Sequence, residues 1–232
     1  KVKSEESSSQ NDNDGLAGLA FSYDSTRNFV RSISRTSGRN VSLWGETSDA
    51  LASDYSGEVY TLDWREFFSL GREHVLALRF VHGWGDDTPR NFKLGGSDSA
   101  ATVLSIANPG FGTPFNRRNY ALRGYKKGIN VLRGRRMRLL SAEWRFPIVR
   151  PERGIMTPPF AASQVSGAVF VDSGDAWNEG SDPDEYYTGV GFEINADTQV
   201  FYNFPLRLRL GIATGLDNVG ENQAYLQLGT AF

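Results

Sequence analysis

Few residues of this chain are of the types that catalyse reactions or bind metals. Cysteine is absent, which excludes disulfides, thiol nucleophiles and cysteine–metal sites. The two histidines, His74 and His82, fall eight positions apart on an expected strand. That spacing separates them by about 26 Å, so they cannot share a metal ion within the strand. The P-loop, G-x-S-x-G and H-E-x-x-H motifs are also absent. We therefore expect no enzyme, no catalytic residue and no cofactor.

A cluster of acids near the end of the chain is the remaining candidate for a metal site. Its members are Asp172, Asp175, Asp182, Asp184 and Glu185. Calcium binds grouped carboxylates, but acidic residues in loops are more often simply solvated. We expect solvated acids here and no bound metal.

The other charged residues alternate with apolar ones, which predicts strands that have one polar and one apolar face. Between 137 and 149, for example, Trp144 and Phe146 alternate with Glu143 and Arg145. The same period of two occurs at 57–70, 76–80, 204–214 and 225–232, and more weakly at 16–24, 39–49, 164–177 and 186–200. This pattern predicts an all-β chain of about nine antiparallel strands.

Two architectures fit this pattern. In a soluble sandwich the apolar face packs inward, whereas in a membrane barrel it meets lipid and the polar face lines the lumen. Several segments are longer than the usual ~5–6 residues of a globular strand, and most tryptophans fall in or at the ends of strands. The polar faces also carry charges of both signs. These features support a barrel, but on their own they leave the two architectures equally open.

Composition excludes other classes of protein. No run of about 18 apolar residues is present, which argues against a transmembrane helix. The net charge is −2, with 25 Lys+Arg against 27 Asp+Glu, so nucleic acid is not expected as a partner. Residues 1–15 are rich in Ser, Asn, Asp and Glu and lack the apolar core of a signal peptide. We interpret 1–15 as a flexible polar segment or an arbitrary start within a longer polypeptide, and 16–232 as the strand region.

Three motifs follow one another in the second half of the chain. The first is Leu122-Arg123-Gly124-Tyr125, the second is Ala142-Glu143-Trp144-Arg145-Phe146-Pro147, and the third runs from Val169 to Trp177 and contains Phe170, Asp172 and Gly174. The final strand runs from Tyr225 to an aromatic last residue, Phe232. In this order and spacing, the motifs resemble those of the BamA/TamA-like outer-membrane protein assembly superfamily, also called the bacterial surface antigen family.

The resemblance implies a fold and a set of site residues. The chain would be the C-terminal portion of an antiparallel transmembrane β-barrel, with about nine strands of sixteen and a long inward-folded loop at 84–136. Arg123 would reach Glu143 and Asp172 from inside the lumen. Gly124 would allow a tight turn beside the wall, and Tyr125 would pack against it. Phe170 and Gly174 would belong to the strand motif, and Tyr225 and Phe232 to a C-terminal assembly signal. The alternative is that Arg123 is a solvated loop charge.

The resemblance also implies a function at the bacterial outer membrane. A barrel of this superfamily would insert, assemble or translocate proteins. Its partners would be outer-membrane lipid and lipopolysaccharide, a client or passenger polypeptide, and accessory subunits that are periplasmic or lipoproteins. The alternative is an export pore or membrane anchor for an attached N-terminal passenger or enzyme domain.

Overall fold

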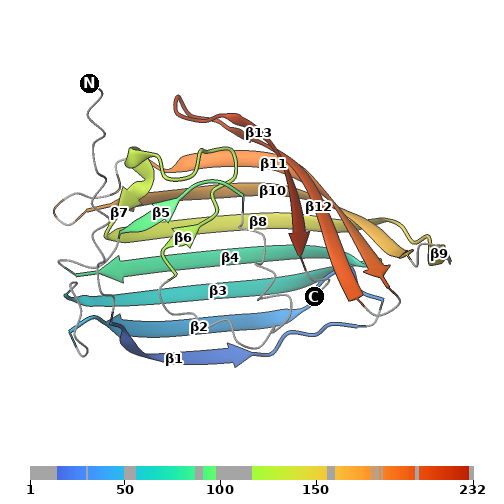
Figure 1. The fold of residues 1–232 in the computed structure, drawn as a ribbon, viewed down its shortest axis with the longest axis horizontal. Helices are drawn as coiled ribbons and strands as arrows, with labels where there is room; N and C mark the ends of the chain where they lie inside the picture. Colours follow the sequence, from blue (N-terminus) through green and yellow to red (C-terminus); the bar gives the residue numbers. More distant parts are fainter. Residues whose placement is uncertain are drawn as a thin grey trace, which may run out of the picture.

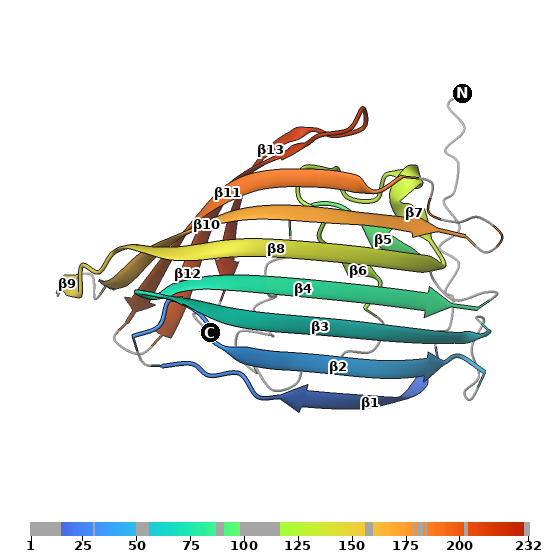
Figure 2. The same ribbon diagram turned by 180° about the vertical axis from the view of Figure 1, so that it is seen from behind.

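The computed structural model describes residues 15–29, 31–49, 56–86, 91–97, 117–155, 160–178, 180, 183, 185–201 and 204–229. Most of them form one antiparallel sheet (Figures 1 and 2). Its strands, in spatial order, are β1 (Ala17–Asp24), β2 (Gly38–Thr47), β3 (Glu58–Gly71), β4 (His74–Gly85), β8 (Arg136–Val149), β10 (Phe160–Trp177), β11 (Tyr187–Val200), β12 (Phe204–Gly215) and β13 (Asn222–Gly229). A short strand, β9 (Arg153–Ile155), pairs with the start of β10.

The nine strands predicted from the period of two are all present, and the all-β antiparallel fold is confirmed. Their bounds differ in places: β4 continues to Gly85, and β10 begins at Phe160 rather than Gln164. The sheet is not closed. Among the described residues, β1 pairs only with β2, and β13 pairs only with β12. Closure into a barrel therefore stays a prediction. The predicted role of Phe232 and the interpretation of 1–14 fall on residues outside the described ones.

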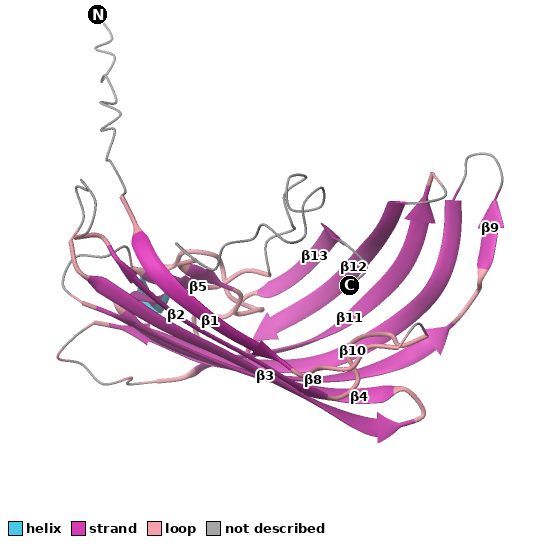
Figure 3. Cartoon of the chain, turned by 90° about the horizontal axis from the view of Figure 1, so that it is seen from below, coloured by secondary structure: helices cyan, strands magenta, loops and turns pink. Residues whose placement is uncertain are grey.

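The sheet curves into an open trough whose two faces differ in chemistry (Figure 3). The outer face carries accessible apolar side chains such as Trp144 on β8 and Leu210 on β12, which are 47% and 55% exposed. The inner face carries ionised side chains such as Asp63, Glu143 and Glu193. The alternation in the sequence thus places apolar side chains on one face of the sheet and charged side chains on the other.

In the connection between β4 and β8, the described residues 91–97 and 117–135 lie on the inner face near one end of the strands (Figure 1). They form a small sheet in the order β6 (Asn119–Tyr120), β5 (Phe92–Leu94) and β7 (Arg133–Gly134), with a short 3-10 helix, η1 (Asn130–Leu132). Fully buried side chains of this connection, among them Phe92, Leu94, Leu122 and Tyr125, pack on wall residues that include Val81 and Met137. Burying each such side chain stabilises the fold by roughly 1.5–3 kcal/mol.

The main apolar core therefore lies between the connection and the wall. Within the part of the chain that the structure describes, no helix is long and apolar enough to cross a membrane.

Candidate functional site

Arg123 is the centre of the most elaborate polar cluster on the inner face. Its side chain is 8% exposed and reaches three carboxylates on three adjacent strands. Nε lies 2.6 Å from Asp172 Oδ2, Nη2 lies 2.9 Å from Glu143 Oε1, and Nη1 lies 3.0 Å from Glu193 Oε1. Nη2 also donates to Asp172 Oδ1 at 2.7 Å, which makes the Asp172 pair bidentate. The structure thus brings Arg123 to both acids that the resemblance implies, and to Glu193 as well.

The register of the wall strands explains why these acids converge. Glu143 on β8 is directly opposite Phe170 on β10, and Ala168 on β10 is opposite Glu193 on β11. Side chains two positions apart on a strand share a face, so Asp172 joins them on the inner side. The Phe170 ring lies beneath the guanidinium, 3.4 Å from its central carbon to the ring centroid. Three acids and one aromatic platform therefore surround a single arginine.

Charge balance at the cluster is completed by two further arginines of the wall. Arg145 donates to Glu143 at 2.6 Å, and Arg209 lies 3.7 Å from Glu193. Three guanidinium groups thus accompany three carboxylates. Burying ions is tolerated only with such pairing. The cluster can hold a segment of chain in place, but it presents no free nucleophile or base.

Gly124 fits where no side chain could. Its φ is +92°, in the left-handed region that favours glycine. A Cβ at this position would lie 2.5 Å from the backbone nitrogen of Gly215, at the end of β12. Its carbonyl accepts from the amide of Glu221 at 2.8 Å, and its amide donates to Gln223 Oε1 at 3.2 Å. The tetrad is therefore held against the β12–β13 turn by its own backbone.

Tyr125 contacts the same turn and the start of β11 through its hydroxyl group. Its hydroxyl lies 2.8 Å from the carbonyl oxygen of Thr188 and 2.5 Å from Asp217 Oδ2. Burial, followed by the bond to Asp217, raises the pKa of Tyr125 to about 12. Leu122, the first residue of the tetrad, is fully buried in the core under the connection. All four residues of the tetrad thus contact the inside of the sheet or its rim.

The remaining motif residues have structural places. Gly174 lies close to the neighbouring strand, because a Cβ on it would lie 2.8 Å from the backbone oxygen of Arg138 on β8 and 3.3 Å from the Leu94 side chain of β5. Tyr225 of the final strand points inward, and its hydroxyl lies 2.5 Å from Glu193 Oε1. That contact adds Tyr225 to the Arg123 cluster, whereas its predicted part in a C-terminal assembly signal stays a prediction.

A second ion pair fixes the connection to the sheet, and the sequence alone did not predict it. Arg118 Nη2 lies 2.5 Å from Glu46 Oε2 on β2, and both side chains are buried. In the sequence, Arg118 is one of seven basic residues between 117 and 136 besides Arg123, and no motif distinguishes it from the others. Glu46 shares an inward parity with the buried Trp44, which was the available hint. The connection is therefore fixed to β2 on one side and to β8, β10 and β11 on the other.

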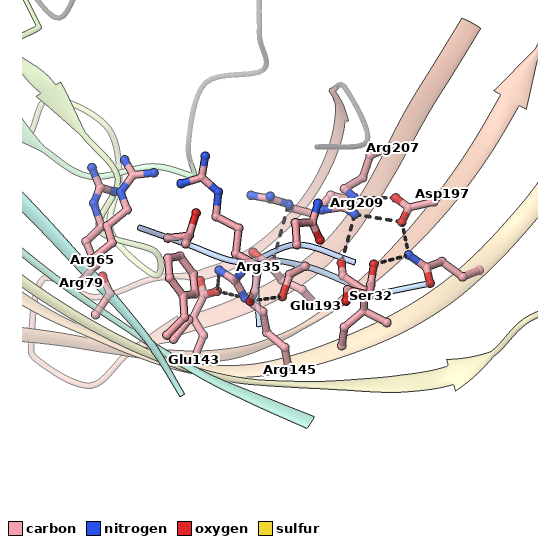
Figure 4. A pocket seen from close by; sticks show the side chains of 18 of the residues that line it. Ser32, Arg35, Arg65, Arg79, Glu143, Arg145, Glu193, Asp197, Arg207 and Arg209 are labelled. Atoms are coloured by element: carbon pink, nitrogen blue, oxygen red, sulfur yellow. Dashed lines mark hydrogen bonds and ion pairs between the residues drawn. The ribbon is translucent and has the colours of Figure 1, made fainter. Parts of the chain in front are cut away.

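The turn between β1 and β2 also crosses the inner face. The carbonyl of Ser32 accepts from Gln164 on β10 at 3.3 Å, and the carbonyl of Ile33 accepts from Arg207 on β12 at 3.2 Å. Ile33 keeps only 3% of its surface exposed. Between this turn and the Arg123 cluster lies a cavity of about 880 Å³ (Figure 4).

Within the described ranges, no three His, Cys, Asp or Glu side chains are grouped to hold a metal ion. The case for a function rests on the fold and on the contacts around Arg123. In comparison with known proteins, no protein-family model matches the chain and no curated protein matches its sequence.

Proposed function

We propose that this chain is the C-terminal part of a β-barrel of the bacterial outer membrane, similar to the BamA/TamA-like superfamily. It would take part in inserting, assembling or translocating proteins, without catalysis of its own. The observation that carries the proposal is the separation of the two faces of the sheet. The outer face is apolar and accessible, while the inner face is charged and holds an anchored connection.

The exposure of the outer face argues against a soluble sandwich. In a sandwich the apolar side chains of both sheets interdigitate. Here Leu19, Ile212 and Leu226 are each more than 60% exposed, and accessible apolar side chains recur on all nine wall strands. Soluble monomers rarely expose contiguous apolar patches beyond a few hundred Å². Lipid is the solvent that suits such a face.

Within the described residues, β1 and β13 each have one edge without a partner strand, which supports a larger barrel. In hydrocarbon, each unsatisfied backbone group costs several kcal/mol, so membrane sheets close. We propose that further strands complete a barrel of sixteen. The contacts of Arg123 with Glu143 and Asp172 are those that the resemblance implies, and they support the family assignment. Lipid and lipopolysaccharide would contact the outer face, and a client polypeptide and accessory subunits would be the other partners.

The test is cell fractionation of the full-length protein, with gel migration before and after heating. A closed barrel resists detergent at room temperature, so it should migrate faster unheated than boiled and fractionate with outer membranes. A known outer-membrane barrel and a periplasmic protein are the controls. Recovery of a detergent-free soluble monomer with one migration rate would exclude the proposal.

A second candidate function is an export pore or membrane anchor for an attached N-terminal passenger or enzyme domain. The polar cavity on the inner face favours it, because a pore needs a polar interior.

A further inference from the structure

The cavity between the Arg123 cluster and the β1–β2 turn has an excess of positive charge. Seven arginines line it, against four acidic residues. Figure 4 shows them spread along it, with Arg65 and Arg79 at one end and Arg207 and Arg209 at the other. A fifth carboxylate, that of Asp63, is bound by Arg65 and Arg79 together. A sixth carboxylate, that of Asp24, lies 3.3 Å from Arg35, so the seven arginines exceed the acids in and around the cavity by one.

The accessible surface of the cavity is more cationic than this count alone indicates. In the ion pairs formed by the strand arginines of the cavity, the carboxylate is the more deeply buried partner, whereas Arg123 is more buried than Glu143, at 8% against 17% exposed. Asp63 is 6% exposed while Arg65 is 36% exposed, and Glu193 is 4% exposed while Arg209 is 35% exposed. The same order holds for Glu143 with Arg145 and for Asp197 with Arg207. A ligand in the cavity would therefore contact these guanidinium groups more readily than the carboxylates behind them.

We propose that this cavity binds acidic stretches of polypeptide, which rests on the proposed function in which a client or passenger chain passes this wall. Guanidinium groups bind carboxylates through paired N–H donors and are weakly hydrated, so the exchange of water for carboxylate is favourable. The volume is larger than one small anion needs. Five of the arginines come from β3, β4, β8 and β12, so several carboxylates of an extended segment can be bound at once.

Two of the exposed arginines can be removed without stranding an acid. In Arg65→Gln, Asp63 keeps its pair with Arg79 at 2.8 Å. In Arg209→Gln, Glu193 keeps its pair with Arg123 at 3.0 Å. The matched control is Arg133→Gln, because Arg133 is exposed on β7 and does not line the cavity. The double variant and the control should both fold, which heat-dependent migration will verify.

The experiment measures fluorescence anisotropy of labelled oligoglutamate and oligolysine of equal length with the purified full-length protein in detergent. We expect oligoglutamate to bind and oligolysine not to. The Arg65→Gln/Arg209→Gln variant should raise the Kd for oligoglutamate about tenfold, and Arg133→Gln should leave it within about twofold. Added salt should weaken the binding, because these guanidinium groups are partly accessible.

Three results would overturn the inference: equal binding of both peptides, unchanged affinity in the double variant, or displacement of the peptide by equimolar inorganic phosphate. The last would identify a small-anion site. Failure of the proposed function is separable. A protein that lacks heat-dependent migration yet prefers oligoglutamate would refute the barrel and keep the acidic-peptide site. A heat-modifiable barrel without that preference would refute the site alone.

Discussion

Arg123 shows why a single arginine can organise a large part of this molecule. Its planar guanidinium has five donors, and the structure uses them on three carboxylates above an aromatic ring. Lysine offers only a point charge and could not form the bidentate pair with Asp172. Glu143 and Glu193 each have another arginine, but Asp172 has no other ion-pair partner in the described part of the chain.

Replacing Arg123 by alanine should release the connection from the wall. Loss of one member of a buried ion pair commonly costs ~3–5 kcal/mol, and water in a lumen should reduce that to about half. We expect limited chymotrypsin digestion to cut the connection in Arg123→Ala while the wall strands stay protected. Arg133→Ala is the control, because Arg133 is the exposed arginine of a second L-R-G sequence at 132–134. Equal digestion of the two variants would show that the tetrad is incidental.

At the scale of elements, the wall strands could be predicted and the small inner elements could not. The period of two persists over 14 residues in β3, β8 and β11, so it is legible in the sequence. The strands β5, β6 and β7 have two or three residues each, too few for a period. They exist because apolar residues of the connection are buried against the wall, which is a tertiary cause.

The ion-pair partners likewise fall into those that the sequence could indicate and those that depend on tertiary contacts. Glu143 and Asp172 came from a resemblance that carries spatial information. For Glu193, alternation along its strand gives the face of the sheet but not the partner, so the sequence alone does not pair it with Arg123. The Arg118–Glu46 pair joins residues 72 positions apart, and nothing local in the sequence links them.

The fit between the connection and the β12–β13 turn makes a second prediction. In Gly124→Ala, the new Cβ would clash with the backbone of Gly215, and the alanine would have to adopt a positive φ. The turn must therefore move. Gly128→Ala is the matched control, because Gly128 has a φ of +78° but no atom within 4 Å of the added Cβ. The control should lose only the backbone term, ~1–3 kcal/mol. Gly124→Ala should lose clearly more, measured by urea unfolding, and equal losses would contradict the close approach.

For the whole molecule, the decisive property is which solvent the outer face meets. Leu210 lies near the middle of β12, and Leu216 lies just beyond its end, with exposed fractions of 55% and 61%. Water would tolerate a charge at either position. Lipid distinguishes them, because arginine costs ~2–4 kcal/mol at the midplane of a bilayer and ~0–1 kcal/mol near its surface.

Leu210→Arg should therefore lower the folded, heat-modifiable fraction in membranes much more than Leu216→Arg. Densitometry of unheated and boiled outer-membrane samples measures that fraction. If both variants assemble like the parent protein, the outer face does not lie in hydrocarbon.

The position of Arg123 in the chain also sets an order of events. Its partners Asp172 and Glu193 follow it by 49 and 70 residues, and Gln223, which holds Gly124, follows that glycine by 99. Contacts of such separation form late, because closing long loops costs entropy. The tetrad cannot be seated until β8, β10 and β11 are side by side and the β12–β13 turn has formed. Formation of the tetrad's contacts therefore reports that the sheet from β8 to β13 has already formed.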